Sequence, residues 1–269
     1  MNGLDAWIFE RRPLPHMRLR LPAANSVVVV ATVGDETGKP DLGYGADDSA
    51  SSPRDRRALA EAMGVEAGRL VFMQQVHGNR VTEVDASQAG AGLGARGSAI
   101  ARTDALVTRD GGLALVGLSA DCPLVALWDD GGRWAALAHA GWRGLAAGIL
   151  DNVVSELSAR GVAPGQLRAA TGPHIERCCY EVGEDVVRAL LERGRAAQEH
   201  FTRTSDYRTY LDLGEVIGYQ LAMAGVGADR LLRCALCTCC QAKMLHSYRR
   251  DGPAAGAGRQ AMAVRLRGP

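Results

Sequence analysis

One segment, Leu118–Gly144, constrains the fold of this chain most, because it connects two apolar runs that each lead to a possible metal ligand. The runs, Leu113–Ser119 and Trp134–Ala138, predict buried strands. Cys122 follows the first run, and His139 follows the second and precedes a glycine-rich turn. A strand, a ligand, a glycine turn and a helix start in this order are typical of sites at strand ends in α/β proteins.

A third candidate ligand, His77, ends an earlier apolar run, Leu70–Val76. Catalytic zinc sites usually have three protein ligands of these residue types and one open position for water. The wide gaps between His77, Cys122 and His139 match no zinc-finger spacing, so two other interpretations stay open. Cys122 could be a thiolate nucleophile with His139 as its base. The three residues could also be a buried cysteine and two hydrogen-bonded histidines.

Hydrophobic patterns elsewhere predict alternating strands and helices. Further strands are expected at Ser26–Val33, near Arg80–Val84, and at Leu167–Thr171, Arg230–Cys234 and Gln260–Leu266. Helices are expected over Arg54–Met63 between an N-cap at Ser52 and Gly64, over 145–157, over Glu184–Glu192 and over Leu213–Met223. Pro253–Gly258 is expected to be a flexible loop. Because several strands follow one another through short turns, the order favours a mixed sheet, or two sheets.

Length and composition suit a globular protein with a sizeable core, and we expect one domain over residues 1–269. The net charge of +1 gives no support to nucleic-acid or anionic-membrane binding. No apolar run is long enough to span a bilayer, and the N-terminus lacks the apolar stretch of a secretory signal.

The cysteine pattern predicts free thiols. The seven cysteines form an odd set with adjacent pairs, which fits a disulfide framework poorly and favours a reducing cytoplasm. The run from Cys234 to Cys240 contains four cysteines and could suggest a metal site. We interpret these, and the Cys178-Cys179 pair, as core cysteines, because no second pair stands at zinc-finger distance.

Basic and glycine-rich stretches predict an anion site. Gly141–Gly144 opens a predicted helix, whose free N–H groups and dipole favour a phosphate, and Arg143 adds a planar set of donors. Ser247-Tyr248-Arg249-Arg250 supplies further guanidinium groups. The alternative is a solvated basic surface.

Taken together, these stretches resemble the laccase-domain proteins, a family also described as polyphenol oxidases, purine nucleoside phosphorylase-type enzymes and peptidoglycan editing factors. The matching segments run in family order, and three of them are specific: Ala120-Asp121-Cys122-Pro123, the run from His139 to Gly144, and the run from Ser247 to Gly252. The other matching segments are Gln75–Gly78, Asp104–Thr108, Gly172-Pro173, Cys179–Gly183, Cys237-Thr238 and Gly258-Arg259.

The resemblance implies a compact α/β sandwich of mixed sheets flanked by helices. It implies that His77, Cys122 and His139 bind zinc in a cytoplasmic enzyme that cleaves adenosine, inosine, guanosine and methylthioadenosine with phosphate and also deaminates adenosine. Residues expected to bind substrate or phosphate are Arg56, Arg143, Gly144, Ser247 and Arg249. The family usually has Asn-Arg where this chain has Asp55-Arg56, and Gly-Asp where it has Ala46-Asp47, so substrate choice could differ.

The positions of Asp121 and Arg143 suggest two chemical roles. Asp121 is a candidate acid/base for attack of a zinc-bound water on the purine, although a carboxylate that orients a histidine is the commoner arrangement. Arg143 and the helix start, together with Arg249, are expected to hold phosphate for phosphorolysis.

Three other functions stay open. One is a cytoplasmic hydrolase that edits mis-built peptidoglycan precursors through the metal or the Cys122 thiolate. Another is a copper polyphenol oxidase, which the chain's six histidines and lack of an H-x-H pair disfavour, although Cu²⁺ could occupy the site. A metal-stabilised binding module would instead predict a closed site with four ligands. The expected partners are a nucleoside and phosphate, with no nucleic acid and no membrane.

Overall fold

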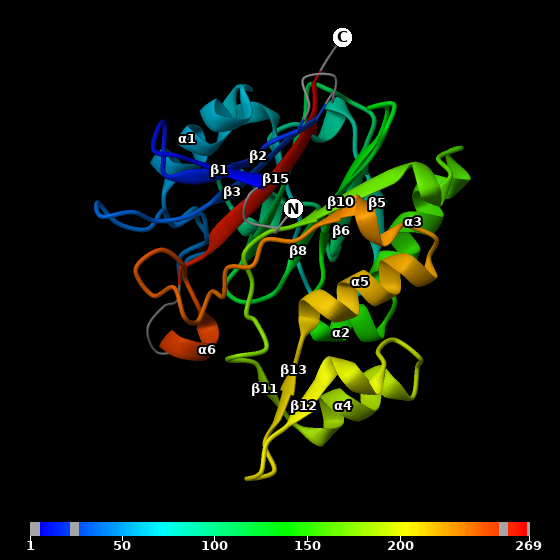
Figure 1. The fold of residues 1–269 in the computed structure, drawn as a ribbon. Helices are drawn as coiled ribbons and strands as arrows, with labels where there is room; N and C mark the ends of the chain where they lie inside the picture. Colours follow the sequence, from blue (N-terminus) through cyan, green and yellow to red (C-terminus); the bar gives the residue numbers. More distant parts are fainter. Residues whose placement is uncertain (1–5, 22–26, 253–257, 268–269) are drawn as a thin grey trace.

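The computed structural model describes residues 6–21, 27–252 and 258–267. Two six-stranded mixed sheets stack face to face and helices cover their outer faces (Figure 1). The first sheet has the order β1 (Trp7–Glu10), β2 (His16–Leu19), β3 (Val27–Thr32), β15 (Gln260–Leu266), β7 (Ala114–Ser119), β4 (Leu70–Phe72). The second has the order β14 (Leu231–Leu232), β10 (Leu167–Thr171), β8 (Leu124–Asp129), β9 (Ala135–His139), β6 (Ala105–Thr108), β5 (Val81–Glu83).

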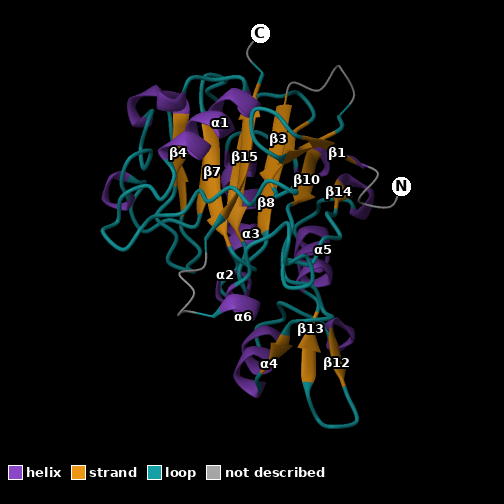
Figure 2. Ribbon diagram, turned by 90° about the vertical axis from the view of Figure 1, so that its left-hand side faces the viewer, coloured by secondary structure: helices purple, strands orange, loops and turns teal. Residues whose placement is uncertain are grey.

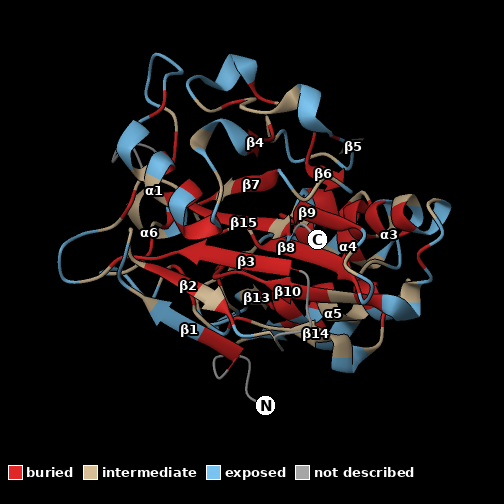
Figure 3. Cartoon of the chain, turned by 90° about the horizontal axis from the view of Figure 1, so that it is seen from above, coloured by how far each residue is buried: buried red, intermediate tan, exposed pale blue. Residues whose placement is uncertain are grey.

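Alternation of side chains along each strand builds the layers. In β3, Val29 points between the sheets and packs with Leu115, Trp128 and Leu137, whereas Val30 points to the opposite face. Both faces of the strands are covered, so the strands read as continuous apolar runs. Figure 3 shows the result as a buried interior of strands with exposed residues at the periphery.

Helices cover the two outer faces. α1 (Pro53–Met63) packs Leu59 and Met63 on the first sheet. α3 (Ile149–Ala159) and α5 (Leu213–Met223) pack on the second sheet and contact each other. The remaining helices are α2 (Trp142–Ala146), α4 (Glu184–Leu191) and α6 (Tyr248–Asp251). The predicted α/β sandwich of mixed sheets flanked by helices is therefore confirmed.

A third, smaller sheet lies beside α4. Its strand order is β11 (Glu181–Val182), β13 (Thr209–Leu211), β12 (Phe201–Arg203). Figure 2 shows this sheet and α4 below the two large sheets. These three short strands were not predicted, because two- and three-residue strands carry too little hydrophobic periodicity to be recognised.

Local capping signals were predicted correctly. The hydroxyl of Ser52 accepts from the Asp55 N–H at the start of α1, and Gly64 ends that helix with φ +69°. The predicted strand at Ser26–Val33 is confirmed from Val27 onward, and residue 26 lies outside the described residues. The predicted loop at Pro253–Gly258 also lies outside them, except for Gly258.

Two predictions about elements were wrong, and one central strand was not predicted. The strand predicted to end at Val76 ends at Phe72, and the next strand, β5, belongs to the other sheet. The helix predicted over 145–157 is broken at Gly148, which has φ +82°. β8 was missed, although Asp129–Gly132 is a turn signal and β8 and β9 form an antiparallel pair around it. No helix in the described part of the chain combines the length and apolarity that a membrane span requires.

Candidate metal centre

The structure brings together the three predicted ligands, His77, Cys122 and His139, whose ligand atoms all lie within 4.8 Å of one another. The Cys122 Sγ is 3.9 Å from the His77 Nε2, and the rings of His77 and His139 meet edge to face with centroids 4.8 Å apart. His139 is buried, Cys122 is half-buried and His77 is exposed, so the group opens to solvent on the His77 side. We call these residues the His-Cys-His site.

Strand ends from both large sheets position the site. Cys122 lies in the crossing from β7 to β8, and His139 is the last residue of β9. His77 lies between β4 and β5. The Gln75 amide donates to the Leu118 carbonyl at 2.7 Å and accepts from the Leu118 N–H at 2.9 Å, which ties the His77 segment to β7 after β4 has ended.

A single carboxylate, Asp104, connects two of the candidate ligands. It accepts from the His139 Nδ1 at 2.9 Å and from the backbone N–H groups of His77 and Gly78 at 2.9 and 2.8 Å. Asp104 is fully buried. Burial raises its pKa, but the hydrogen bonds from His139 and Gly78 lower the pKa overall, so it remains a carboxylate. This contact fixes the tautomer that leaves the His139 Nε2 free to bind a metal.

The electrostatics of the site favour a thiolate. Burial raises the pKa of Cys122, but the charge of His139 and hydrogen bonds from both histidines lower it to about 6. Burial lowers the pKa of His139, but the charge of Cys122 and the Asp104 carboxylate raise it to about 9. In the absence of a metal, the two groups therefore form a thiolate–imidazolium pair, which is the protonation pattern of an activated cysteine.

Close packing and strained backbone surround the ligands. His77 and Asp121 adopt positive φ angles of 60° and 113°. A Cβ atom at Gly141 would lie 2.9 Å from the Cys122 Sγ and 3.4 Å from the His77 Cδ2, so only glycine fits there. Such strain is concentrated at functional sites, where the surrounding structure holds it in place.

The interpretation of Asp121 as a carboxylate that orients a histidine was wrong, because Asp104 has that role. Asp121 is buried, and its two oxygens accept from the Thr238 hydroxyl and from the Arg249 N–H, each at 2.6 Å. Both oxygens are therefore engaged in holding distant segments beside Cys122. This arrangement leaves little capacity for the predicted acid/base role.

Two exposed arginines and a tyrosine stand near the site. The Arg249 guanidinium is 5.3 Å from the Tyr180 ring centroid and donates to the carbonyls of Cys179 and Glu181. The Arg143 guanidinium is 4.4 Å from the centroid of the Trp142 ring. Burial and the Cys122 charge raise the Tyr180 pKa, and the charges of Arg249 and Arg143 oppose that rise. These charges therefore act on the same side of the molecule as the thiolate.

Arg56 does not line a substrate surface, which corrects its predicted role. Its side chain is fully buried and lies between the rings of Tyr44 and Phe72. Its guanidinium donates to the carbonyls of Leu42, Gly43, Gly92 and Leu93. A fully buried cation requires such partners, and here they hold loops around α1.

Ser247 also has a structural role rather than the predicted phosphate contact. It is fully buried, and its hydroxyl accepts from the Arg250 N–H at 3.2 Å as the N-cap of α6. Gly144 is buried, and a side chain there would meet the carbonyl oxygens of Gly78 and His139. A phosphate contact from its N–H stays a prediction.

The predicted long helix after Gly141 is in fact the five-residue α2, whose dipole is smaller than that of a long helix. Sequence reasoning also missed Asp104 and Tyr180 as parts of the site. Both residues lie in segments that carried the family resemblance, but they are distant in sequence from the residues they contact. Only the folded chain reveals those contacts.

The His-Cys-His site fits a zinc ion on its own geometry. Zinc binds thiolate at about 2.3 Å and imidazole at about 2.0 Å, which places S and N ligands about 3.5 Å apart in a tetrahedron. The 3.9 Å between Cys122 and His77 is close to that separation. The Asp104 carboxylate behind His139 is the usual support for a metal-binding imidazole.

The chain is similar in sequence and in fold to known proteins. A sequence model of the family described as multi-copper polyphenol oxidoreductase laccase matches residues 37–267. Purine nucleoside phosphorylase YlmD of Geobacillus stearothermophilus is 34% identical over 209 residues, 76% of each chain. Its crystal structure superposes with a TM-score of 0.86 and 30% identity, covering 97% of this chain and 100% of that one. Adenosine deaminase RL5, from an unknown prokaryotic organism, is 31% identical over 210 residues, 78% of this chain and 80% of its own.

Proposed function

Because the chain belongs to the family of multi-copper polyphenol oxidoreductase laccases, whose relatives include purine nucleoside phosphorylases and an adenosine deaminase, we propose that it is a zinc-dependent purine nucleoside phosphorylase that also deaminates adenosine. Its proposed substrates are adenosine, inosine, guanosine and methylthioadenosine. The convergence of His77, Cys122 and His139 beside two exposed arginines carries the proposal.

In this proposal His77, Cys122 and His139 hold the zinc ion, which when bound would activate a water or polarise a substrate oxygen. Asp104 orients His139 and carries no proton in the reaction. Asp121 keeps Cys122 and the Arg249 segment in place. The open His77 side admits the nucleoside, and Tyr180 is available to contact it.

Phosphorolysis requires a phosphate oxygen to attack the anomeric carbon of the ribose while the purine base leaves. We assign the phosphate to Arg143 and Arg249, because the planar guanidinium group matches phosphate oxygens and both side chains are exposed. Each phosphate contact of this kind contributes about 1.5–3 kcal/mol.

The polyphenol oxidase alternative gains no support from the site. A blue-copper site with a trinuclear copper cluster needs many imidazoles. Of the chain's six histidines, His77 and His139 belong to the site, and His16, His174 and His200 are buried elsewhere. The sixth, His246, donates from its Nε2 to the Pro40 carbonyl oxygen at 3.0 Å. The peptidoglycan-precursor hydrolase stays a prediction that no contact in the site favours.

We also propose that residues 1–269 form one domain of this family, since one core between the sheets includes both Trp7 and Leu266. A cytoplasmic location is proposed from the seven cysteines, all of which are free thiols.

The test is incubation of zinc-loaded protein with adenosine, with and without phosphate, followed by chromatography of the products. Adenine that forms only with phosphate supports phosphorolysis, and inosine that forms without phosphate supports deamination. Neither product from folded, zinc-loaded protein would overturn the proposal. His77→Ala should abolish both activities.

Arg143→Ala tests the phosphate site separately. The expected result is a rise of about tenfold to a hundredfold in the KM for phosphate, with a smaller change in the KM for adenosine. Arg133→Ala is the matched control, because Arg133 is exposed in the turn between β8 and β9, at the opposite end of these strands from the site. An unchanged KM for phosphate in Arg143→Ala would refute the assigned role.

A further inference from the structure

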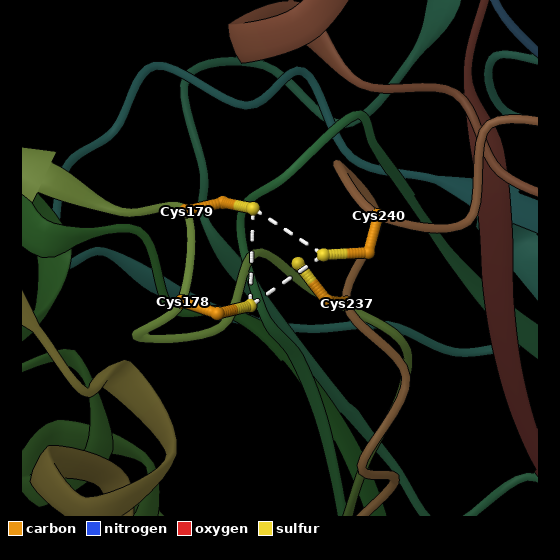
Figure 4. A group of neighbouring side chains, drawn as sticks. All are labelled: Cys178, Cys179, Cys237 and Cys240. Atoms are coloured by element: carbon orange, nitrogen blue, oxygen red, sulfur yellow. Dashed lines mark hydrogen bonds between the residues drawn. The ribbon is translucent and has the colours of Figure 1, made fainter.

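Four cysteine sulfurs gather outside the His-Cys-His site. The residues are Cys178, Cys179, Cys237 and Cys240, and their sulfur atoms all lie within 4.8 Å of one another. Figure 4 shows the four side chains pointing toward a common centre from two separate segments of the chain. We call them the four-cysteine cluster. The interpretation as core cysteines is correct for Cys237, which is buried, but wrong for Cys178 and Cys240, which are exposed.

The distances between the sulfurs match those of a metal tetrahedron. Zinc–thiolate bonds of about 2.3 Å place neighbouring sulfurs about 3.8 Å apart. The Cys240 sulfur lies 3.4 Å from that of Cys179 and 3.6 Å from that of Cys178, and the Cys178 and Cys179 sulfurs are 3.8 Å apart. A disulfide requires sulfurs about 2.05 Å apart. The separations therefore fit shared coordination better than pairwise bonding.

The local backbone resembles that of a metal-binding turn. Cys237-Thr238-Cys239-Cys240 has the C-x-x-C spacing that supplies two thiolates to structural zinc sites. The Glu176 N–H donates to the Cys237 sulfur at 3.4 Å. The segment that carries Cys178 and Cys179 therefore stabilises a thiolate at Cys237. Such N–H···S bonds orient the ligands of a metal site.

Two adjacent arginines hold the two segments. The Arg249 guanidinium donates to the Cys179 carbonyl at 3.2 Å, and the Arg250 guanidinium donates to the carbonyls of Thr238 and Cys239 at 2.8 and 3.0 Å. The cluster thus has preformed geometry, a backbone donor to one sulfur, and two arginines that hold its backbone segments.

We propose that the four-cysteine cluster is a second metal site, which binds zinc through four thiolates. With four protein ligands this site is closed and structural, in contrast to the three-ligand His-Cys-His site. The cation joins segments that are about sixty residues apart, and both lead to the candidate active site. One carries Tyr180, and the other carries Thr238, whose hydroxyl donates to Asp121.

Elemental analysis of protein purified in zinc and reductant tests the site. Unaltered protein should contain two zinc ions per chain. Cys178→Ser, Cys240→Ser and His77→Ala should each contain one, and His77→Ala combined with Cys240→Ser should contain none. Cys239→Ser is the matched control and should keep two, because Cys239 lies in the same turn but outside the group of four.

Cobalt substitution in His77→Ala keeps the test valid if the cysteine variants fail to fold. The remaining cobalt should show the strong thiolate-to-metal charge transfer and intense visible bands of a tetrahedral four-sulfur site. One zinc per chain in unaltered protein, with none in His77→Ala, would overturn the proposal. A second result would also overturn the proposal. In that result the protein holds no second metal, and its mass is lower by the hydrogens lost when the cluster's thiols form disulfides.

Discussion

Asp104 shows how one side chain can organise a candidate metal site without being one of its three candidate ligands. It is buried and accepts hydrogen bonds from the His139 ring and from the backbone N–H groups around His77. It thereby sets the orientation of the His139 ring and holds the strained turn at His77. Cys122 is positioned differently, because Gly141 leaves just enough space for its sulfur.

Asp104→Asn should lower zinc affinity about tenfold to a hundredfold, the usual effect of removing the partner of a metal-binding imidazole. The amide replaces an acceptor with an NH₂ group, which would face other N–H donors. Competition with a chromophoric chelator measures the affinity. Asp206→Asn, at an exposed aspartate, is the control and should have no effect. Unchanged affinity in a folded Asp104→Asn protein would contradict this account.

At the level of elements, a break between two helices follows the second histidine ligand. α2 starts after Gly141, and the chain turns at Gly148 before α3 begins. Apolar residues spaced by four across the break predict one helix, but the left-handed backbone at Gly148 separates two. This turn allows α2 to stay near His139 while α3 packs along the second sheet.

Gly148→Ala should lower the free energy of unfolding by about 1–3 kcal/mol, because φ +82° is unfavourable for alanine. Its Cβ would also lie 2.8 Å from the Arg195 Nη2. Urea denaturation measures the change. Gly218→Ala within α5 is the control, since its Cβ would make an ordinary 3.6 Å contact. That variant should be as stable as the parent or about 1 kcal/mol more stable. Equal effects at both glycines would be inconsistent with the backbone explanation.

For the whole molecule, the packing of the two large sheets determines where the ligands meet. Gly117 of β7 faces the second sheet, and a Cβ there would lie 2.7 Å from the Leu124 Cδ2 and 3.4 Å from the Leu137 Cδ2. The sheets thus approach closely near the strand ends that carry Cys122 and His139. The site lies at this junction and takes ligands from connections of both sheets.

Gly117→Ala should destabilise the protein by about 1–3 kcal/mol through overpacking between the sheets. Adding Leu124→Val, which removes one carbon from the crowded contact, should recover part of the loss. Thermal or urea unfolding of the two single variants and the double variant measures this coupling. Strictly additive losses would show that the two residues do not interact across the sheets.

Removal of metal should destabilise the whole molecule, because the His-Cys-His site connects both sheets. For zinc at about a hundred times its Kd, the stabilisation is about 2.7 kcal/mol, so chelation should lower Tm by roughly 5–10 °C. Added zinc should restore the original Tm. The shift should shrink in His77→Ala. An unchanged Tm in protein shown by elemental analysis to lack metal would contradict this prediction.

The sequence by itself determined the local features of this protein. Ser52 marks the start of α1 and Gly64 marks its end, and β3 and β15 are apolar runs in the sequence. These features are local because capping and burial patterns act over a few neighbouring residues. Ligand types at strand ends and the family motifs also predicted that His77, Cys122 and His139 form one site, and their ligand atoms lie together in the structure. These signals lie in residue type and short-range order, which folding does not change.

Only the tertiary structure decided which distant residues meet. The contact of Asp104 with His139, the burial of Arg56 and the meeting of Cys178 and Cys179 with Cys237 and Cys240 all join segments far apart in the chain. Such contacts depend on sheet order and on how the two sheets stack. No periodicity or spacing along a single segment encodes them, so the roles of these residues became visible only in the folded molecule.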